Sequence, residues 1–314
     1  MSGTGVRRAA AGGAGRDSQA AIRPPAGEGA GRKRRVLRWS RVLIYALLLL
    51  FTVFYLLPVY VVVADSFKTL REVNTTSIWQ PPHGIDFGAW ASALTPPLVG
   101  SGGIGPGLVN SVIMTVPAVV VSSVWGSLNG YLLSKWRFRG ADLVFAFLLF
   151  GMFIPYQAIL IPLVQFLEKL HLYGTLAGLS LTHILYGIPI TTLIFRNYYS
   201  SIPTELVEAA TVDGAGIIGV YARVILPLSI PGFVVVGIWQ FTSIWNEFLF
   251  GVTLTSDPSV QPVTVALQNL AGSFAALYNV QMAGAIMTAI PTLLAFIFLG
   301  RYFIRGLLAG SLKG

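Results

Sequence analysis

The chain has 314 residues, of which 54% are hydrophobic and only 11% are charged. Soluble globular proteins carry roughly 25% charged residues, so this composition excludes an ordinary water-soluble fold and indicates an integral membrane protein. The sequence contains no cysteine, which excludes disulfides, thiolate metal sites and a cysteine nucleophile.

The chain begins with a basic arm. Residues 1–35 are rich in Gly, Ala and Arg without apolar periodicity, so we expect them to be disordered. The run from Arg32 to Arg35 can be a nucleic-acid patch, a contact with anionic lipid or a topology signal. Its place directly before a long apolar stretch favours the topology signal.

Six apolar stretches within residues 36–314 are long enough to cross a bilayer as helices, which takes about 20 residues. They are residues 42–64, 108–133, 141–167, 175–195, 230–254 and 282–304. Neighbouring groups can bond the carbonyls that a proline frees inside such a helix. Pro155, Gln157 and Pro162 make the third stretch the weakest of the six. The sequence therefore predicts an all-α membrane domain with six spans.

The basic residues give these spans an orientation. With a cytoplasmic N-terminus, eighteen Lys and Arg lie on the inner side, and only Lys68, Arg71 and Lys169 lie outside. This distribution satisfies the positive-inside rule, so both termini are predicted to be cytoplasmic. The basic excess then reflects topology, and we expect contact with membrane lipid and none with nucleic acid.

Residues 196–229, here called the acidic loop, separate the fourth and fifth predicted spans on the inner side. Three of the twelve acidic residues of the chain lie there, at Glu205, Glu208 and Asp213. A helix is expected to begin at a Ser201 or Thr204 cap and to end at Gly214. A second short helix is expected from Ile217 to Val224. Such short helices are marginal alone and need a partner surface.

The acidic loop carries a spaced motif: Glu208-Ala209-Ala210, three residues, Gly214, nine residues, then Val224-x-Leu226-Pro227. This motif resembles the EAA loop of ABC importer permeases, with Val224 where isoleucine is usual. Three other stretches are similar to the second permease of maltose-type carbohydrate importers, namely Ser66-Phe67-Lys68-Thr69, Trp245-Asn246-Glu247-Phe248 and the tail 305–314. The resemblance covers about residues 40–314. It implies a type I ABC importer permease fold for sugar uptake.

The resemblance also implies how the acidic loop works. In the family, the loop sits in a groove of a cytoplasmic ATPase subunit. Glu208 would then meet basic residues there, Ala209 and Ala210 would permit close approach, and Gly214 would set the bend. Asp213, Leu226 and Pro227 belong to the same expected coupling surface. The implied partners are a homologous permease, two ATPase subunits or domains and an extracytoplasmic solute-binding protein, all at the plasma membrane.

No nucleotide site is expected in this chain. The sequence has no Gly-Lys dipeptide, so a phosphate-binding P-loop is excluded. We expect no enzymatic activity, no cofactor and no metal here, with ATP and Mg bound by the partner ATPase. The lone His183 in the fourth predicted span is expected to be a hydrogen-bonded packing residue, and Gly126 to Gly130 a surface for close helix contact.

The fifth predicted span has a polar face. At 100° per residue, its polar side chains fall within one arc of about 160°. They include Trp239, Gln240, Ser243, Asn246 and Glu247 as the candidate translocation path. A carboxylate inside a membrane usually faces a bundle interior or a water-filled cavity. Two readings stay open here: contact with a passing sugar, or hydrogen bonds near the outer end to a neighbouring helix.

Other functions compete with sugar import. One is an ABC permease for glycerol phosphate, a peptide or an amino acid. Another is an ion-coupled carrier, which would show an internal repeat and more buried ionisable groups than this sequence has. A membrane-embedded hydrolase would need a clustered nucleophile and base. The aromatic residues Trp79 and Trp90 can form an interfacial belt or contact a solute-binding protein, and the belt is favoured.

Overall fold

The computed structural model describes residues 39–95, 103–136, 138–271 and 277–311. Within these ranges the chain is helical with short connections and contains no strand, so the predicted all-α class is confirmed. The predicted disordered arm at 1–35 lies outside the described residues.

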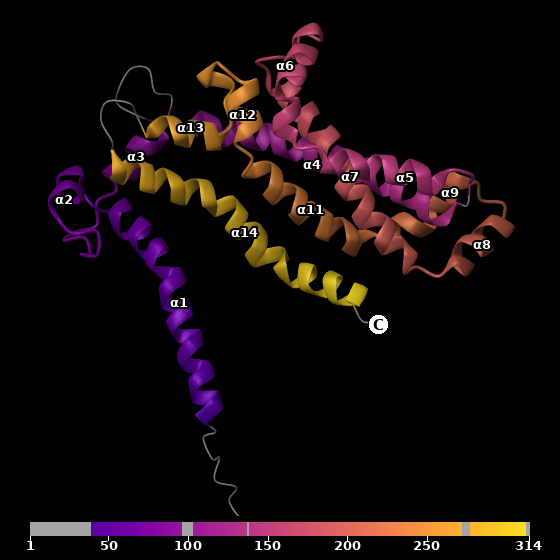
Figure 1. Ribbon diagram of the computed structural model, residues 1–314, viewed down its shortest axis with the longest axis horizontal. Coiled ribbons are helices and arrows are strands. Elements are labelled where there is room, and N and C mark those ends of the chain that lie inside the picture. Colours follow the sequence, from indigo (N-terminus) through magenta and orange to yellow (C-terminus); the bar gives the residue numbers. More distant parts are fainter. Residues whose placement is uncertain (1–38, 96–102, 137, 272–276, 312–314) are drawn as a thin grey trace, which may run out of the picture. The chain divides into compact units, whose positions relative to one another are not determined.

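The described helices follow one another along the chain, with short 3₁₀ and π segments between some of them (Figure 1). The α-helices are α1 (Trp39–Ser66), α2 (Leu70–Thr75), α3 (Gly88–Leu94), α4 (Ile104–Lys135), α5 (Ala141–Phe150), α6 (Leu160–Lys169), α7 (Leu176–Ser200), α8 (Thr204–Val212), α9 (Ile217–Val220), α10 (Leu226–Leu228), α11 (Ile230–Trp245), α12 (Leu249–Leu254), α13 (Val263–Leu270) and α14 (Tyr278–Ser311).

The chain divides into two units, Met1–Thr52 and Val53–Gly314, and α1 crosses the boundary between them. In the first unit the described residues form a single apolar helical segment, Trp39–Thr52. The second unit contains all the other described helices and all of the candidate sites.

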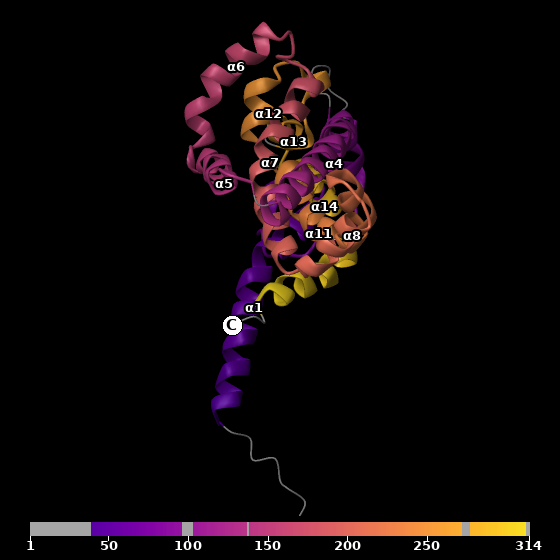
Figure 2. The ribbon, with the colours of Figure 1, turned by 90° about the vertical axis from the view of Figure 1, so that its right-hand side faces the viewer.

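Within the described residues, four helices are long and apolar enough to cross a membrane, at Arg41–Ser66, Ile104–Lys135, Leu176–Ser200 and Tyr278–Gly300. Two bent pairs pass the same test together. Ala141–Phe153 with Tyr156–Lys169 is bent by 87°, and Ile217–Leu228 with Ile230–Trp245 by 76°. Counting each pair as one span gives up to six. Figure 2 shows the turn of the chain between α5 and α6.

Two of the predicted spans therefore differ from the structure. The predicted span 141–167 is broken between Phe153 and Tyr156, where Pro155 intervenes. Proline removes a backbone donor, and it disfavours helical geometry in the residue before it. The predicted span 230–254 is also interrupted, because α11 ends at Trp245 and α12 begins only at Leu249.

The centre of the second unit is the pair α4 and α7, which lie side by side in both views (Figures 1 and 2). A Cβ added to Gly126 would lie 2.0 Å from the Thr191 hydroxyl oxygen, so only glycine permits this approach. The Thr191 hydroxyl donates to the Ser122 carbonyl at 2.9 Å across the same contact. The expected close helix contact at Gly126 to Gly130 is thus confirmed, since small residues let membrane helices approach.

Helix α11 packs against both helices of this pair and α13 packs against α4, while α14 packs against α11 and α13. The indole of Trp245, 2% exposed, donates from Nε1 to the Thr288 carbonyl of α14 at 3.0 Å. The Asn110 side chain of α4 donates to the carbonyls of Ser259 and Gln261 at 2.8 and 3.0 Å. These bonds satisfy buried polar groups. The first fixes the end of α11 against α14, and the others fix the segment after α12 against α4.

Candidate functional site

The acidic loop begins inside α7, which runs to Ser200, and continues into α8. Pro203 is the residue before α8, and no side chain caps the helix, so the predicted Ser201 or Thr204 cap is wrong. A proline here fixes the backbone at φ −56°.

The predicted end of α8 is confirmed. Gly214 adopts φ 85°, the left-handed conformation that glycine takes without a Cβ penalty. The amides of Gly214 and Ala215 donate to the carbonyls of Thr211 and Ala210, each at 3.0 Å. These two hydrogen bonds satisfy carbonyls in the last turn of α8, and the chain turns sharply after them.

The second helix of the acidic loop extends beyond the predicted Ile217–Val224. It consists of α9, a π-helical turn at Tyr221–Ile225 and α10, which reaches Leu228. Single π turns inside α-helices often mark functional positions. Here the π turn carries two buried side chains, Tyr221 and Ile225, which join the core formed with Tyr131 and Phe195.

The other face of the acidic loop is exposed. Glu208, Ala209, Asp213, Gly214, Leu226 and Pro227 are all exposed, and Ala210 is half-buried. Neither Glu208 nor Asp213 forms an ion pair within the described part of the chain. Val212 and Ile218 are 87% and 79% exposed and add apolar surface beside these carboxylates. Large exposed apolar side chains rimmed by polar groups mark a contact surface for another molecule.

Hydrogen bonds tether the buried face of the acidic loop to the central helices. The Tyr131 hydroxyl of α4 donates to the Ile217 carbonyl at 3.0 Å. Ser127, also on α4, shares its hydroxyl with those of Tyr199 and Tyr221, at 2.6 and 2.8 Å. The Lys135 ammonium donates to the Ile202 carbonyl at 2.5 Å. The Tyr198 hydroxyl of α7 donates to the Leu228 carbonyl at 2.8 Å. A displacement of the loop is therefore resisted by bonds to α4 and α7.

A cavity of about 500 Å³ opens between α8 and the end of α4. Glu208 lines it together with Lys135, Trp136 and Thr211. The predicted coupling glutamate thus stands at the edge of a hollow that a side chain of another protein can enter.

A second cavity, of about 350 Å³ and here called the His183 cavity, brings together four of the five candidate path residues. Trp239, Gln240, Ser243 and Glu247 line it. Asn246 does not, because its side chain donates to Thr242 and Thr292 instead.

The predicted helical face is wrong for the last two of these residues. Because α11 ends at Trp245, Asn246 and Glu247 lie beyond the helix and not on its face. Gln240 is 2% exposed and donates to the Ser122 hydroxyl of α4 at 2.8 Å, so it also holds two helices together. The interpretation as a solute path is supported by the residues that line the cavity. The interpretation as hydrogen bonds to a neighbouring helix is supported by Gln240 and Asn246.

The His183 cavity contains residues that the sequence analysis missed or assigned otherwise. His183 was expected to be a hydrogen-bonded packing residue, but its Nε2 has no hydrogen-bond partner among the described residues. Tyr156 and Tyr186 line the same cavity. A signal existed for His183, as an isolated imidazole in an apolar span, but nothing in the sequence places it opposite Glu247.

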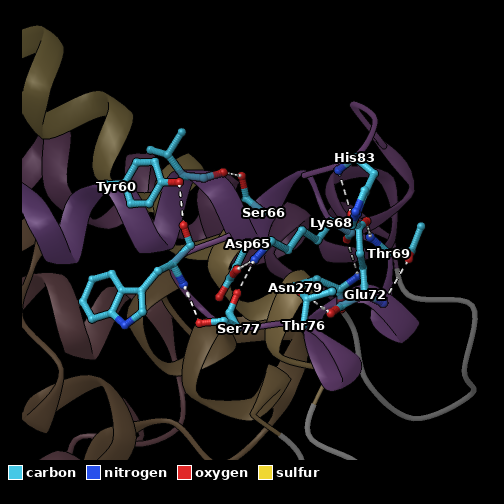
Figure 3. A network of polar contacts seen from close by, with 12 residues as sticks. Tyr60, Asp65, Ser66, Lys68, Thr69, Glu72, Thr76, Ser77, His83 and Asn279 are labelled. Atoms are coloured by element: carbon cyan, nitrogen blue, oxygen red, sulfur yellow. Dashed lines mark hydrogen bonds and ion pairs between the residues drawn. The ribbon is translucent and has the colours of Figure 1, made fainter. Parts of the chain in front are cut away.

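Residues 66–95, here called the connecting segment, follow α1 and are held by buried charges (Figure 3). The ammonium of Lys68 lies 2.7 Å from a carboxylate oxygen of Asp65, and both side chains are buried. The same ammonium donates to the Ser77 carbonyl at 3.3 Å. Asn279 of α14 donates to the Lys68 carbonyl at 3.2 Å. The motif residue Lys68 is thus part of the packing.

Glu72 organises the rest of the connecting segment (Figure 3). It forms a capping box with Thr69 and accepts from both the backbone amide and the ring Nδ1 of His83, at 2.7 and 2.6 Å. The backbone hydrogen bond from His83, followed by the ring contact, lowers the pKa of the Glu72 carboxyl. Nearby, Trp90 stacks on Phe67, whereas the Trp79 side chain is 54% exposed.

Among the described residues, no group of three or more His, Asp or Glu is arranged to hold a metal ion. What the geometry offers is a contact surface on the acidic loop and a polar cavity among apolar helices. Together with the candidate spans, these two features are typical of a multi-pass membrane protein that contacts another molecule.

Comparison with known proteins identifies the family. The model for binding-protein-dependent transport system inner membrane components matches residues 122–308, and the chain belongs to that family. It is a multi-pass membrane protein and the permease component of a transport system.

Individual relatives agree. A probable ABC transporter permease of Pyrococcus horikoshii is 57% identical over 178 residues, and the match spans 57% of this chain but only 65% of that relative. A xylose/arabinose import permease of Haloferax volcanii is 37% identical over 85% of this chain and 92% of its own. The crystal structure of a bacterial ABC transporter for import of the acidic polysaccharide alginate contains a chain with the same fold. That chain is 24% identical, with TM-score 0.74, and the match covers 86% of this chain and 98% of that one.

Proposed function

We propose that this chain is one membrane-spanning subunit of an ATP-driven, binding-protein-dependent sugar importer. It pairs with a homologous permease and with two cytoplasmic ATPase subunits or domains, and it receives sugar from an extracytoplasmic solute-binding protein. The chain itself binds no nucleotide or metal. The proposal for sugar is supported by the pentose import permease to which 85% of the chain is similar.

The observation that carries the proposal is the two-sided construction of the acidic loop. Its outer face presents Glu208 and Asp213 without ion pairs in the described structure, beside exposed Val212 and Ile218. Its other side is bonded to α4 and α7. A partner that moves this loop also pulls on the helices to which it is tied.

Each motif residue has a place in this coupling. Glu208 meets a basic group of the ATPase, which gives a charge-assisted hydrogen bond. Ala209 and Ala210 allow α8 to seat closely, and Asp213 adds a second carboxylate at the helix end. Gly214 makes the bend. Leu226 and Pro227 lie in the return helix beside the π turn.

The loop is cytoplasmic in this proposal, as are both termini, because the positive-inside distribution requires it. Closure of the ATPases then rocks the spans as rigid bodies, so that the pathway opens alternately to each side. Trp239, Gln240, Ser243 and Glu247 contribute to the pathway at the His183 cavity.

Replacing Glu208 with lysine tests the proposal, and Glu168→Lys is the matched control because Glu168 is an exposed glutamate on α6, outside the acidic loop. In proteoliposomes with all partner subunits, Glu208→Lys should lower ATP-dependent sugar uptake by on the order of tenfold or more, since it sets like charges against each other at a contact. The control should transport normally. Unchanged uptake in Glu208→Lys contradicts the coupling role, and uptake by this chain without any ATPase contradicts the importer assignment.

A further inference from the structure

An apolar groove lies between α11 and α14, two helices that pack against each other (Figure 1). It has a volume of about 580 Å³, and its walls come from α10, the first half of α11 and Leu299 of α14. Every residue that lines it is apolar or a glycine, so the groove differs from the polar His183 cavity. We call it the α11–α14 groove.

The groove has open space along α11. Ile230 at its start is 65% exposed, and a Cβ added to Gly237 would meet no atom within 4 Å. The lining residues of α11 extend from Ile230 to Ile238. Over that stretch an α-helix rises by roughly 12 Å. This rise is comparable to the hydrocarbon of one leaflet, which is half of a core about 30 Å thick.

The molecule that fills this groove is therefore expected to be apolar over the depth of one leaflet. Water gains no hydrogen bonds from walls that carry no polar groups. A membrane-spanning helix of another protein needs about 20 residues, whereas the groove follows α11 only from Ile230 to Ile238. An acyl chain extends from the headgroups to the middle of the bilayer, so its length suits the groove.

Positive charge lies near the α10 end of the groove. Arg223 is exposed on the π turn, four residues before Pro227, and residues four apart share one face of a helix. Within the described chain Arg223 forms no ion pair, and no aspartate or glutamate lines the groove. A guanidinium binds phosphate oxygens through two parallel hydrogen bonds. A phosphate headgroup above an acyl chain thus complements both the charge and the groove.

We propose that the α11–α14 groove binds an anionic phospholipid of the inner leaflet. One acyl chain lies along α11 over Gly237, and the phosphate bonds to Arg223. Basic pockets beside membrane spans on the cytoplasmic side bind such headgroups. The groove begins at α10, the last helix of the acidic loop, so the lipid joins this loop to α11 and α14. The inference goes beyond sugar import and rests on the proposed function only for the choice of leaflet.

The test counts the lipids that stay bound to the full complex. Native mass spectrometry of the detergent-solubilised complex follows a titration with phosphatidylglycerol, which is anionic, or phosphatidylcholine, which has no net charge. The wild type should bind at least one phosphatidylglycerol more tightly than phosphatidylcholine. Arg223→Gln should weaken that binding about tenfold through loss of charge-assisted hydrogen bonds, and Arg223→Lys should restore part of it. Gly237→Leu should weaken it severalfold, because the new side chain occupies the groove.

Matched controls replace the same residue types outside the groove. Arg139→Gln removes an exposed arginine that lies on the same predicted side of the membrane. Gly151→Leu adds a side chain at another glycine whose added Cβ would meet no atom within 4 Å. Both should bind phosphatidylglycerol like the wild type. Size-exclusion chromatography checks that each variant assembles, and the Arg223 variants decide alone if Gly237→Leu does not.

Three results would overturn the lipid site. The first is equal affinity of the wild type for the two lipids, or unchanged phosphatidylglycerol binding in Arg223→Gln. The second is a loss of ATP hydrolysis in Arg223→Gln without added lipid, which places Arg223 against an ATPase. The third is protection of Gly237→Cys, in a chain that has no other cysteine, from a lipid-soluble maleimide, since a second permease then covers the groove.

The proposed function is tested separately from the lipid site. The titration uses neither sugar nor ATP, so its result does not depend on the transported solute. A wild-type complex that binds phosphatidylglycerol as expected but imports no sugar contradicts the proposed function and leaves the lipid site in place.

Discussion

The connecting segment (residues 66–95) and the acidic loop (residues 196–229) both consist of short helices joined by turns, but they use charge differently. In the connecting segment the charged groups Lys68 and Glu72 bond to partners nearby, among them Asp65 at the end of α1. In the acidic loop, hydroxyl groups and the Lys135 ammonium of α4 make the tethers, while Glu208 and Asp213 are exposed. The first arrangement uses charge to hold the segment in place, whereas the second leaves charge available to another protein.

The largest expected effect comes from breaking the buried ion pair of the connecting segment. Lys68→Met leaves Asp65 buried without its partner, which should destabilise the second unit by about 3–5 kcal/mol. Thermal unfolding in nanodiscs measures the loss.

The double variant Asp65→Asn with Lys68→Met should recover part of the stability, because no unpaired charge then remains. If Lys68→Met unfolds at the same temperature as wild type, the connecting segment does not depend on this ion pair. The comparison is then wrong in its statement that paired charges hold the connecting segment together.

Next in size is damage to the frame that holds the acidic loop. A Cβ added to Gly130 would lie 2.7 Å from the Arg196 amide nitrogen and 2.8 Å from the Phe195 Cβ. Gly130→Ala should therefore force α4 and α7 apart and cost about 1–3 kcal/mol. Gly237→Ala is the control, because nothing lies within 4 Å of its added Cβ. A more favourable helix propensity should make that control neutral or slightly stabilising.

A finer test removes one tether of the acidic loop. Ser127→Ala deprives the buried hydroxyls of Tyr199 and Tyr221 of a shared partner, at a cost of about 1–2 kcal/mol. Hydrogen exchange of the amides in 217–228 should rise in this variant and stay unchanged in Ser200→Ala, whose hydroxyl is exposed. Equal exchange in both variants contradicts the role of Ser127 as a tether.

The smallest expected effect depends on pH. The bonds from His83 lower the pKa of Glu72 in the folded chain. They therefore stabilise the connecting segment at pH values above the pKa of the unfolded chain, which is about 4.3. This contribution is lost as the pH falls through the pKa of the folded chain. Protection of the Thr69 and His83 amides should therefore decline on acidification below about pH 4.3. Glu72→Gln should show weaker protection at neutral pH and less dependence on pH. An unaltered pH dependence in that variant excludes Glu72 as the titrating group.

The sequence predicted what depends on local pattern. The long apolar helices around Pro58 and Pro117 form, and the end of α8 at Gly214 was predicted from the glycine itself. The break at Pro155 was foreshadowed by the residues that weaken that stretch.

What could not be predicted depends on tertiary contacts. Trp245 ends α11 where its indole bonds to Thr288 of α14, and a helical wheel that assumes a continuous helix cannot show this. Asn246 therefore bonds to Thr242 and Thr292, whereas Glu247 lines the His183 cavity. His183 belongs to the cavity only because two distant breaks meet beside it.

The π turn at Tyr221–Ile225 has a consequence for the length of the chain. A π turn accommodates one residue more than an α-helical turn, and each residue of an α-helix advances the direction of a side chain by about 100°. Deleting one residue here would straighten the turn and rotate everything before it, including α8 and its carboxylates, away from the surface they now occupy. The number of residues in this segment, more than their identity, sets the direction in which the subunit faces its neighbour.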